Sequence, residues 1–204
     1  MAALLSNFRN MMILSVILAI IMIIAFGSAH GIDGQFWQAV FRWMHVVFGI
    51  LWIGLLYYFN FVAIRKTPEI PAELRPALTK YITPEALFWF RYAALMTVLA
   101  GFGIVALHGS TYSAKVFTFG FAGGYTDNDR GYTLMGIGVY LALIMFLNVW
   151  GIIWPNQKIA LGIKEADADA KAKAARIAML ASRTNTLLSL PMLTSMAMYQ
   201  TLFG

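Results

Sequence analysis

Five long apolar runs divide this sequence, and they constrain its fold more than any other feature. A helix that crosses a membrane needs about 20 consecutive, mostly apolar residues. The runs cover about 11–29, 38–63, 87–108, 132–154 and 186–203; the last is the shortest and contains Pro191. They predict an all-α integral membrane bundle of five transmembrane helices, in which residues 1–204 form a single membrane domain.

The composition agrees with a lipid environment. Hydrophobic residues make up 60% of the chain and charged residues 12%, whereas a soluble domain carries about 45–50% apolar and about 25% charged residues. This composition argues against a soluble globular enzyme, a disordered chain and a nucleic-acid-binding protein. The first apolar run is longer than the about 7–15 residues of a signal-peptide core, so we predict that it is a retained span.

Lys and Arg residues are distributed unevenly between the two sides that five spans define. Of the 15, only Arg42, Lys115 and Arg130 fall on one side, and the other twelve share the side of Arg9. Loops on the cytoplasmic side carry an excess of Lys and Arg. We therefore expect a cytoplasmic N-terminus and an external C-terminus, and the net charge of +6 requires no nucleic-acid partner to explain it.

Two connecting segments have a distinctive composition. Residues 109–131 are rich in aromatic residues and Gly. We expect this loop to fold back on the outer end of the bundle, because its rings would otherwise be exposed to water. Residues 157–182 are rich in Ala, Lys, Glu and Asp, which predicts a helix that is solvated or lies on the membrane surface.

The chain has no cysteine and three histidines, His30, His45 and His108. The absence of cysteine excludes disulfides, thiolate metal sites and covalently attached c-type haem. All three histidines fall on the outer half of the predicted bundle. Most of the 12 methionines lie in the middle of spans, where Met is an ordinary packing residue, so copper transport is not favoured.

His45 is the strongest candidate for a cofactor ligand. Phe48 and Gly49 follow it by about one turn on the same face, and Trp52 follows by two turns. A Gly in this position lets a flat ring approach the helix backbone, and aromatic neighbours pack against such a ring. This is the environment of an axial ligand to haem b in a helical bundle.

Two further residues fit the same hypothesis. Arg42 lies one turn outward from His45, where it can neutralise a haem propionate. His108 is the candidate second iron ligand, although it lies about 9 Å nearer the surface at 1.5 Å per residue. The alternative interpretation is that His45 only hydrogen-bonds across helices, and that His30 and His108 are interfacial polar residues.

A second group of polar and aromatic residues lies at the inner ends of the second to fifth spans. Its members are Tyr57, Tyr58, Asn60, Trp89, Arg91, Tyr92, Asn148, Trp154, Asn156, Gln157, Arg183, Asn185 and Ser189. Polar groups at membrane depth need partners and often mark functional sites. The group is suited to a planar, anionic molecule, but aromatic belts and cationic anchors occur at any membrane interface.

Four motifs in this region resemble one protein family. The run at 42–62, RWMHVVFGILWIGLLYYFNFV, resembles the membrane domain of the PuuD-type bacterial urate oxidases (urate hydroxylases). The motifs WFRYAA at 89–94, WPNQK at 154–158 and SRTNTLLSLPM at 182–192 resemble the same domain in the same order. Together they cover the second to fifth spans.

The resemblance implies a function and a location. In that family a helical membrane domain precedes a soluble c-type cytochrome domain, and the enzyme oxidises urate to 5-hydroxyisourate and passes electrons to the respiratory chain. The present sequence lacks the Cys-x-x-Cys-His motif of that cytochrome domain. The resemblance therefore implies a multi-pass protein of the bacterial inner membrane with a periplasmic C-terminus, which passes electrons to a separate cytochrome c or quinone.

The same resemblance implies site residues. Within its motifs lie the candidate substrate-binding residues, which are Asn60, Arg91, Asn156, Gln157 and Asn185. The segment from His45 to Trp52 and Gly54 is also similar to the haem-binding membrane oxidases of haem synthesis and to the copper-resistance D proteins, which carry a His ahead of a Trp-x-Gly motif. That similarity implies a haem ligand at His45.

The sequence thus favours a membrane electron-transfer protein with non-covalent haem b. His45 and His108 are the expected iron ligands, Arg42, Gly49 and Trp52 are the other cofactor-binding candidates, and no catalytic residue is identified. The hypothesis includes a urate oxidase-like activity. The alternative is a non-catalytic accessory subunit of a respiratory or other membrane complex. A small-molecule carrier is disfavoured, because the spans show no repeat symmetry.

Overall fold

The computed structural model describes residues 2–203, apart from the side chains of Ala3 and Ser28, and all regular structure in this range is helical. Four helical segments are long and apolar enough to cross a membrane: Phe8–Gly27, Gly34–Glu69, Arg75–Leu107 and Asp127–Ala160. These segments confirm the all-α prediction and indicate a membrane protein in a lipid bilayer. The predicted fifth span, 186–203, is not among the four.

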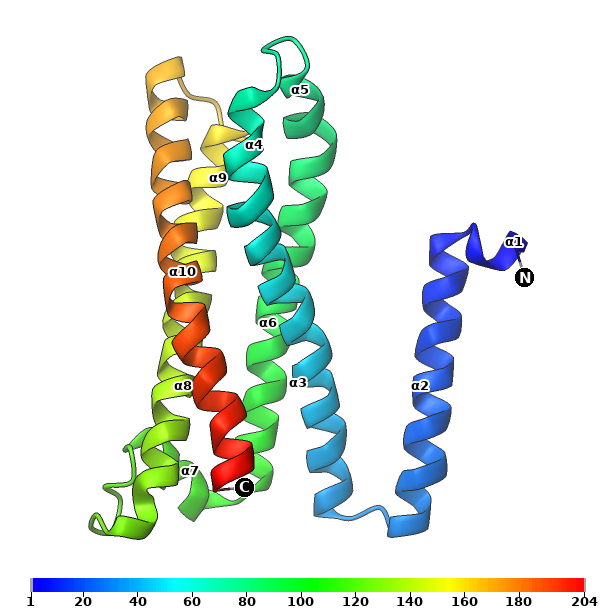
Figure 1. Cartoon of the computed structure of the whole chain (residues 1–204), viewed down its shortest axis with the longest axis vertical. Helices are drawn as coiled ribbons and strands as arrows, with labels where there is room; N and C mark the ends of the chain where they lie inside the picture. The colour runs from blue at the N-terminus through cyan, green and yellow to red at the C-terminus, as the bar shows by residue number, and fades with distance from the viewer. Residues whose placement is uncertain (1, 204) are drawn as a thin grey trace.

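Four long helical segments form the bundle, and short helical turns extend or connect them (Figure 1). The long helices are α3 (Gly34–Tyr57), α6 (Thr83–Leu107), α8 (Arg130–Asn148) and α10 (Ala168–Leu202). The turns that continue or join them are η1 (Tyr58–Ala63), α4 (Ile64–Lys66), η2 (Thr67–Glu69), α5 (Arg75–Ala77), η3 (Leu78–Ile82), α7 (Ser110–Phe117), η4 (Asp127–Asp129), η5 (Val149–Ile153) and α9 (Trp154–Ala160). We call the two ends of the bundle the α7 end and the α5 end.

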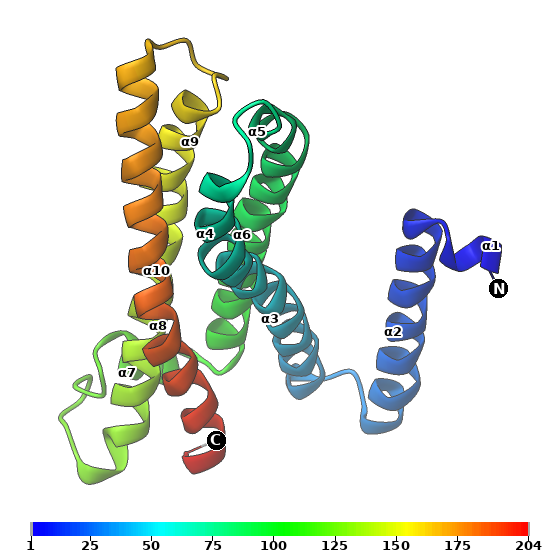
Figure 2. The same cartoon turned by 45° about the horizontal axis from the view of Figure 1, so that its top comes forward.

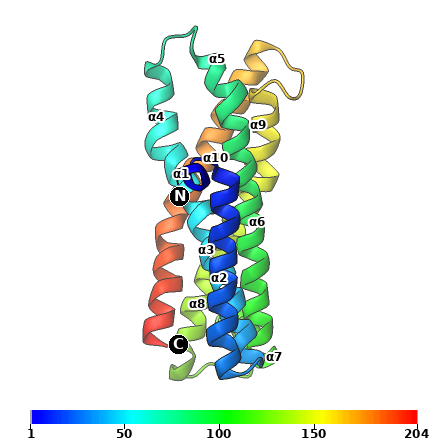
Figure 3. The same cartoon turned by 90° about the vertical axis from the view of Figure 1, so that its right-hand side faces the viewer.

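The N-terminal helix stands apart from this bundle. After the short α1 (Ala2–Leu5), α2 (Phe8–His30) begins at Asn7, whose side chain accepts a hydrogen bond from the backbone N–H of Asn10. Figures 1 and 2 show α2 separated from the bundle and joined to α3 by a short loop, and Figure 3 shows it running along the bundle's long axis. An apolar helix in a bilayer does not need to pack against other helices, because lipid tails contact its apolar side chains.

Small residues allow α3 and α6 to pack closely. Ala93, Ala94, Thr97 and Ala100 of α6 are buried. A Cβ atom added at Gly103 would lie 2.4 Å from the ring of Phe41 on α3, so the ring occupies the space that a side chain would fill. Small residues at helix contacts let two backbones approach each other, which is the usual way that membrane helices associate.

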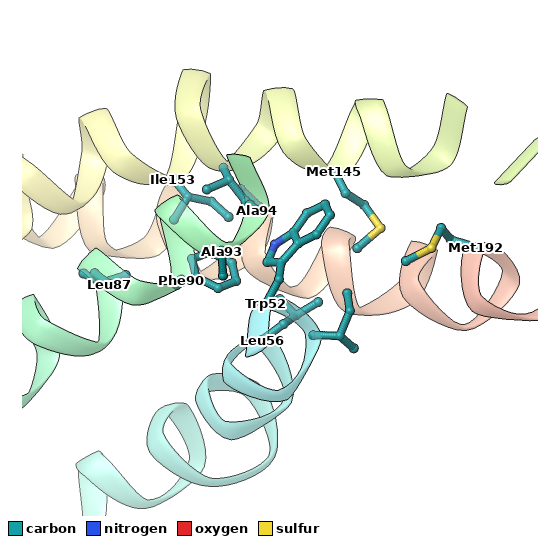
Figure 4. Close-up of a cluster of buried hydrophobic side chains, with 12 residues drawn as sticks. Trp52, Leu56, Leu87, Phe90, Ala93, Ala94, Met145, Ile153 and Met192 are labelled. Carbon is teal, nitrogen blue, oxygen red and sulfur yellow. The ribbon is translucent and has the colours of Figure 1, made fainter. Parts of the chain in front are cut away.

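The centre of the bundle is an apolar core. Trp52 and Leu56 of α3 pack in one cluster with Phe90 of α6, Met145 of α8 and Met192 of α10 (Figure 4). Both residues from α3 are at most 1% exposed. The core therefore fixes α3 against the other three long helices at mid-height.

The last two long segments form an antiparallel hairpin, which corrects one prediction. The predicted helix over residues 157–182 is interrupted, because α9 ends at Ala160 and Gly162 adopts a φ of +74° that favours glycine. Asp167 then caps the start of α10 by accepting a hydrogen bond from the N–H of Ala170. α10 continues through Pro191 to Leu202 and packs along α8 and α9. Residues 168–182 are therefore helical as predicted, and most of their side chains are exposed or half-buried.

The loop at the α7 end folds back on the bundle, as expected from its composition. The hydroxyl of Tyr140 on α8 donates to the carbonyl of Phe117, and that of Thr133 donates to the carbonyl of Phe119. The Lys115 ammonium pairs with Asp129 at 2.5 Å. These contacts cover the α7 end of the bundle.

Candidate functional site

A cavity of about 450 Å³ opens between the long helices near the α7 end. Its volume lies within the about 300–1,000 Å³ of small-molecule sites. Most of its wall is apolar and comes from α3, α6, α8 and α10; Val98, Phe102, Met135, Leu143 and Met196 are examples. Three residues predicted from the sequence also line it, namely Arg42, His45 and His108.

His45 reaches from α3 to the backbone of α6. Its Nδ1 atom lies 2.8 Å from the carbonyl oxygen of Thr97. A carbonyl oxygen only accepts hydrogen bonds, so Nδ1 carries the proton and Nε2 keeps a free lone pair. A Cβ atom added at Gly101 would lie 3.1 Å from the ring's Cε1 atom, so the absence of a side chain at Gly101 makes room for the imidazole.

His108 is held in a similar way at the end of α6. Its Nδ1 atom lies 2.8 Å from the carbonyl oxygen of Ile104 in the preceding turn. Its ring stacks on Tyr112 of α7 with a centroid distance of 4.5 Å and an interplanar angle of 29°. The same tautomer follows, with Nε2 free to act as a ligand.

The cavity offers two imidazole nitrogens as candidate ligands. Among residues 2–203, no hydrogen bond is made to Nε2 of His45 or of His108, and no group of three or more His, Asp and Glu side chains forms a metal site. A metal-ligating His usually donates its other ring N–H to a carbonyl or carboxylate, which fixes its orientation. Imidazole nitrogens of this kind are common ligands of haem iron.

Arg42 adds positive charge to the cavity wall from the exposed side of α3. Tyr112 lies close enough to interact electrostatically with it. Burial and a hydrogen bond with Tyr199 raise the pKa of Tyr112, so this phenol stays neutral at physiological pH. No negative side chain among the described residues lines the cavity, and Arg42 is therefore available to an anionic group such as a propionate.

Two of the predicted cofactor-binding residues lie outside this cavity. A Cβ atom added at Gly49 would touch only the Thr97 methyl group, at 3.8 Å. Trp52 is 1% exposed and belongs to the apolar core. Sequence reasoning missed Gly101, which makes the space for His45; its signal was the Gly-Phe-Gly run at 101–103 in the third span.

The five candidate substrate-binding residues do not share one set of contacts. Asn60 of η1 donates to Ser182 Oγ on α10 at 2.8 Å. Asn185, fully buried on α10, donates to the Met145 carbonyl of α8 at 3.0 Å. Both amides thus hold helices together.

The other three candidates lie on α6 and α9. Asn156 donates to the carbonyl of Ile152, one turn earlier in its own helical segment, and Gln157 is half-buried on α9. Arg91 of α6 places its guanidinium carbon 3.4 Å from the ring centroid of Trp154. The structure therefore brings Arg91 next to the WPNQK motif, which contains Asn156 and Gln157.

His30 lies away from both groups. It is exposed at the end of α2, and its Nε2 atom lies 3.2 Å from Gln35 Oε1.

Comparison with known proteins assigns no family to this chain: no protein-family model, no curated protein and no solved structure matches it. The resemblance to the urate oxidase membrane domain therefore rests on the four motifs alone.

Proposed function

We propose that this protein binds one non-covalent haem b in the cavity at the α7 end and transfers electrons. The observation that carries the proposal is the orientation of two histidines. His45 and His108 line one apolar cavity, and the Nδ1 atom of each bonds to a backbone carbonyl, which leaves each Nε2 free. The bound haem would supply reversible one-electron transfer.

Each residue of the cavity has a defined role in this proposal. The carbonyl of Thr97 orients His45, and the carbonyl of Ile104 together with the Tyr112 ring orients His108. Arg42 balances the negative charge of a propionate. The apolar walls exclude water, which tunes the reduction potential.

We also propose the five-span arrangement, with the C-terminal half of α10 as the fifth span. In this arrangement the N-terminus and the α5 end are cytoplasmic, and the α7 end and C-terminus are periplasmic, in a bacterial inner membrane. Support comes from the Lys and Arg distribution and from the packing of α10 along α8. The haem would then lie near the periplasmic face, where a separate cytochrome c can approach it.

The electron donor in the proposal is a purine such as urate. Its support is the resemblance of the four motifs to the urate oxidase membrane domain. The acceptor is a separate c-type cytochrome or a quinone. Electrons from a substrate at the α5 end would have to cross the apolar core to reach the cavity, so we place no catalytic step at Asn60 or Asn185.

The haem proposal is tested with three histidine variants of the detergent-purified protein. Reduced-minus-oxidised absorption spectra should show a Soret and an α band in the wild type and in His30→Ala, because His30 lies outside the cavity. His45→Ala should lose both bands, and His108→Ala should lose them or change to a high-spin spectrum. A wild-type protein that stays colourless after haem reconstitution would refute the proposal.

The substrate is tested separately. Urate is added anaerobically to the haem-loaded protein, and haem reduction is followed at the α band. Reduction that is absent over hours, in a protein that dithionite reduces at once, removes urate from the proposal while leaving the haem site intact.

A second function, an accessory subunit of a membrane complex, is favoured by the position of α2. Every side chain described along this helix is exposed or half-exposed, and the main packing partners of α2 are α1 and α3. A helix placed in this way is free to pack against another subunit. A colourless protein that forms a stoichiometric complex with larger oxidase subunits would favour this function over the haem proposal.

A further inference from the structure

Arg91 is a buried cation without a counter-charge. It is 8% exposed, and its Nε and Nη1 atoms have no hydrogen-bond partner. Its guanidinium carbon lies 3.4 Å from the centroid of the Trp154 indole, and this cation–π contact supplies no acceptor to its N–H donors. A buried charge normally requires both a charge partner and hydrogen bonds.

A second cation approaches the same ring. The Nζ atom of Lys158 lies 5.8 Å from the centroid of Trp154. The ion pairs among residues 2–203 are Lys66–Glu69, Lys115–Asp129 and Arg130–Asp127, so neither Arg91 nor Lys158 takes part in one. Two positive charges therefore gather at one indole without a carboxylate to balance them.

The acid closest to Arg91 along α6 is engaged elsewhere. Glu85 is in the first turn of α6, and its Oε1 atom accepts a hydrogen bond from the indole N–H of Trp89 at 2.9 Å. One turn before Trp154, the Nε1 atom of Trp150 is buried and also has no acceptor. The α5-end half of the bundle thus holds several N–H donors that lack a partner.

The chemistry of these N–H donors defines the partner that they lack. Arginine and indole N–H groups only donate hydrogen bonds. The missing partner must therefore present acceptor oxygens, and the two uncompensated cations select a partner with negative charge. Phosphate and carboxylate groups supply both properties in one small unit.

We propose that Arg91, Lys158 and the indole N–H of Trp150 form an anion-binding site beside Trp154 at the α5 end, which takes a phosphate or carboxylate group. The site is separate from the histidine cavity and does not depend on haem binding. The same group is available from an anionic phospholipid headgroup, with its acyl chains in the bilayer, or from a soluble anion.

The test is ligand-dependent stabilisation of the detergent-purified protein, because a ligand that binds the folded state raises the melting temperature. The probes are short-chain phosphatidylglycerol, short-chain phosphatidylcholine and inorganic phosphate, each titrated at constant ionic strength. We expect phosphatidylglycerol or phosphate to stabilise the wild type, and phosphatidylcholine to do so less. Stabilisation by phosphatidylglycerol alone identifies a lipid source, and stabilisation by phosphate as well identifies a soluble anion.

Single-residue variants test whether the stabilisation by anionic probes arises at this site. Arg91→Gln should abolish the stabilisation, and Arg91→Lys should retain part of it. Lys158→Gln should weaken the apparent affinity by about tenfold, the order expected when one charged hydrogen-bond donor is lost, and it keeps the test valid if Arg91→Gln does not fold. Arg176→Gln removes an exposed positive charge on α10 and should have no effect. The proposal is overturned if the wild type gains nothing from either anionic probe, or if Lys158→Gln and Arg176→Gln behave alike.

Discussion

The imidazole of His45 on α3 is bonded through Nδ1 to the backbone carbonyl of Thr97 on α6, at 2.8 Å. This bond joins two long helices of the bundle, and its geometry depends on α6 having no side chain at Gly101. The position of His45, the candidate iron ligand on α3, is therefore set by α6. Perturbing α6 should disturb the cofactor site without touching any ligand.

The first prediction concerns Gly101→Ala. The added methyl group would lie 3.1 Å from the His45 ring, closer than most real contacts, so the ring must move or α6 must shift. Overpacking of this kind costs about 1–3 kcal/mol, and we expect a lower melting temperature and less haem per protein. The matched control is Gly49→Ala, whose methyl group would make an ordinary 3.8 Å contact. Equal haem content in the two variants would contradict the assigned role of Gly101.

The second prediction concerns Asn185→Ala on α10. Asn185 is fully buried; its amide donates to the Met145 carbonyl and accepts from Asn148 Nδ2 at 2.8 Å. Its removal takes away two buried hydrogen bonds between α8 and α10, each worth about 0.5–1.5 kcal/mol. Thermal unfolding in detergent should show this loss, whereas Asn156→Ala should change stability little, because its exposed amide bonds only within its own helical segment. If Asn185→Ala is as stable as the wild type, the residue is free for another role, including substrate binding.

These residues also show what the sequence could and could not reveal. Apolar length was enough to locate the first four spans, because it is a property of single segments. His45, His108 and Arg42 could be grouped because their depths follow from the position of each residue along its span. The partner of Asn185 and the role of Gly101 depend on which helix faces which, and no single span encodes that information.

The break after α9 has a different cause. Residues 157–182 have high helix propensity, but Gly162 and the Asp167 cap redirect the chain so that α10 can pack along α8. Tertiary packing thus overrides propensity in this segment. The same packing carries the helix through Pro191, which the sequence placed inside the shortest span.

The third prediction uses pH to test the loop at the α7 end. The hydrogen bond with Asp129 raises the pKa of Lys115 above its ordinary value of 10.5. The contribution of Lys115 is therefore lost as the pH rises through its folded-state pKa. The hydrogen bond with Lys115 also lowers the pKa of Asp129 from 3.8 to about 2, so the pair is lost again in strong acid. The difference in melting temperature between wild type and Lys115→Gln should be constant from above pH 3.8 up to pH 10.5, and should shrink outside this range.

Lys66→Gln is the control for that series, since its pair with Glu69 is exposed on both sides, and exposed ion pairs contribute little to stability. A Lys115→Gln difference that is absent at neutral pH would mean that the ion pair does not hold the loop.

The last prediction concerns Arg42, which lines the cavity that holds both histidines. A positive charge beside a redox group stabilises the reduced form, because reduction adds an electron. Charges in partly solvated sites interact by about 1 kcal/mol over roughly 10–15 Å, so Arg42→Gln should lower the midpoint potential of bound haem by tens of millivolts. Arg130→Gln removes a charge at the same end of the bundle that pairs with Asp127 outside the cavity, and it should leave the potential unchanged. Spectroelectrochemical titration of the three proteins measures this directly; equal potentials would place the propionates away from Arg42 and require a different orientation of the haem in the cavity.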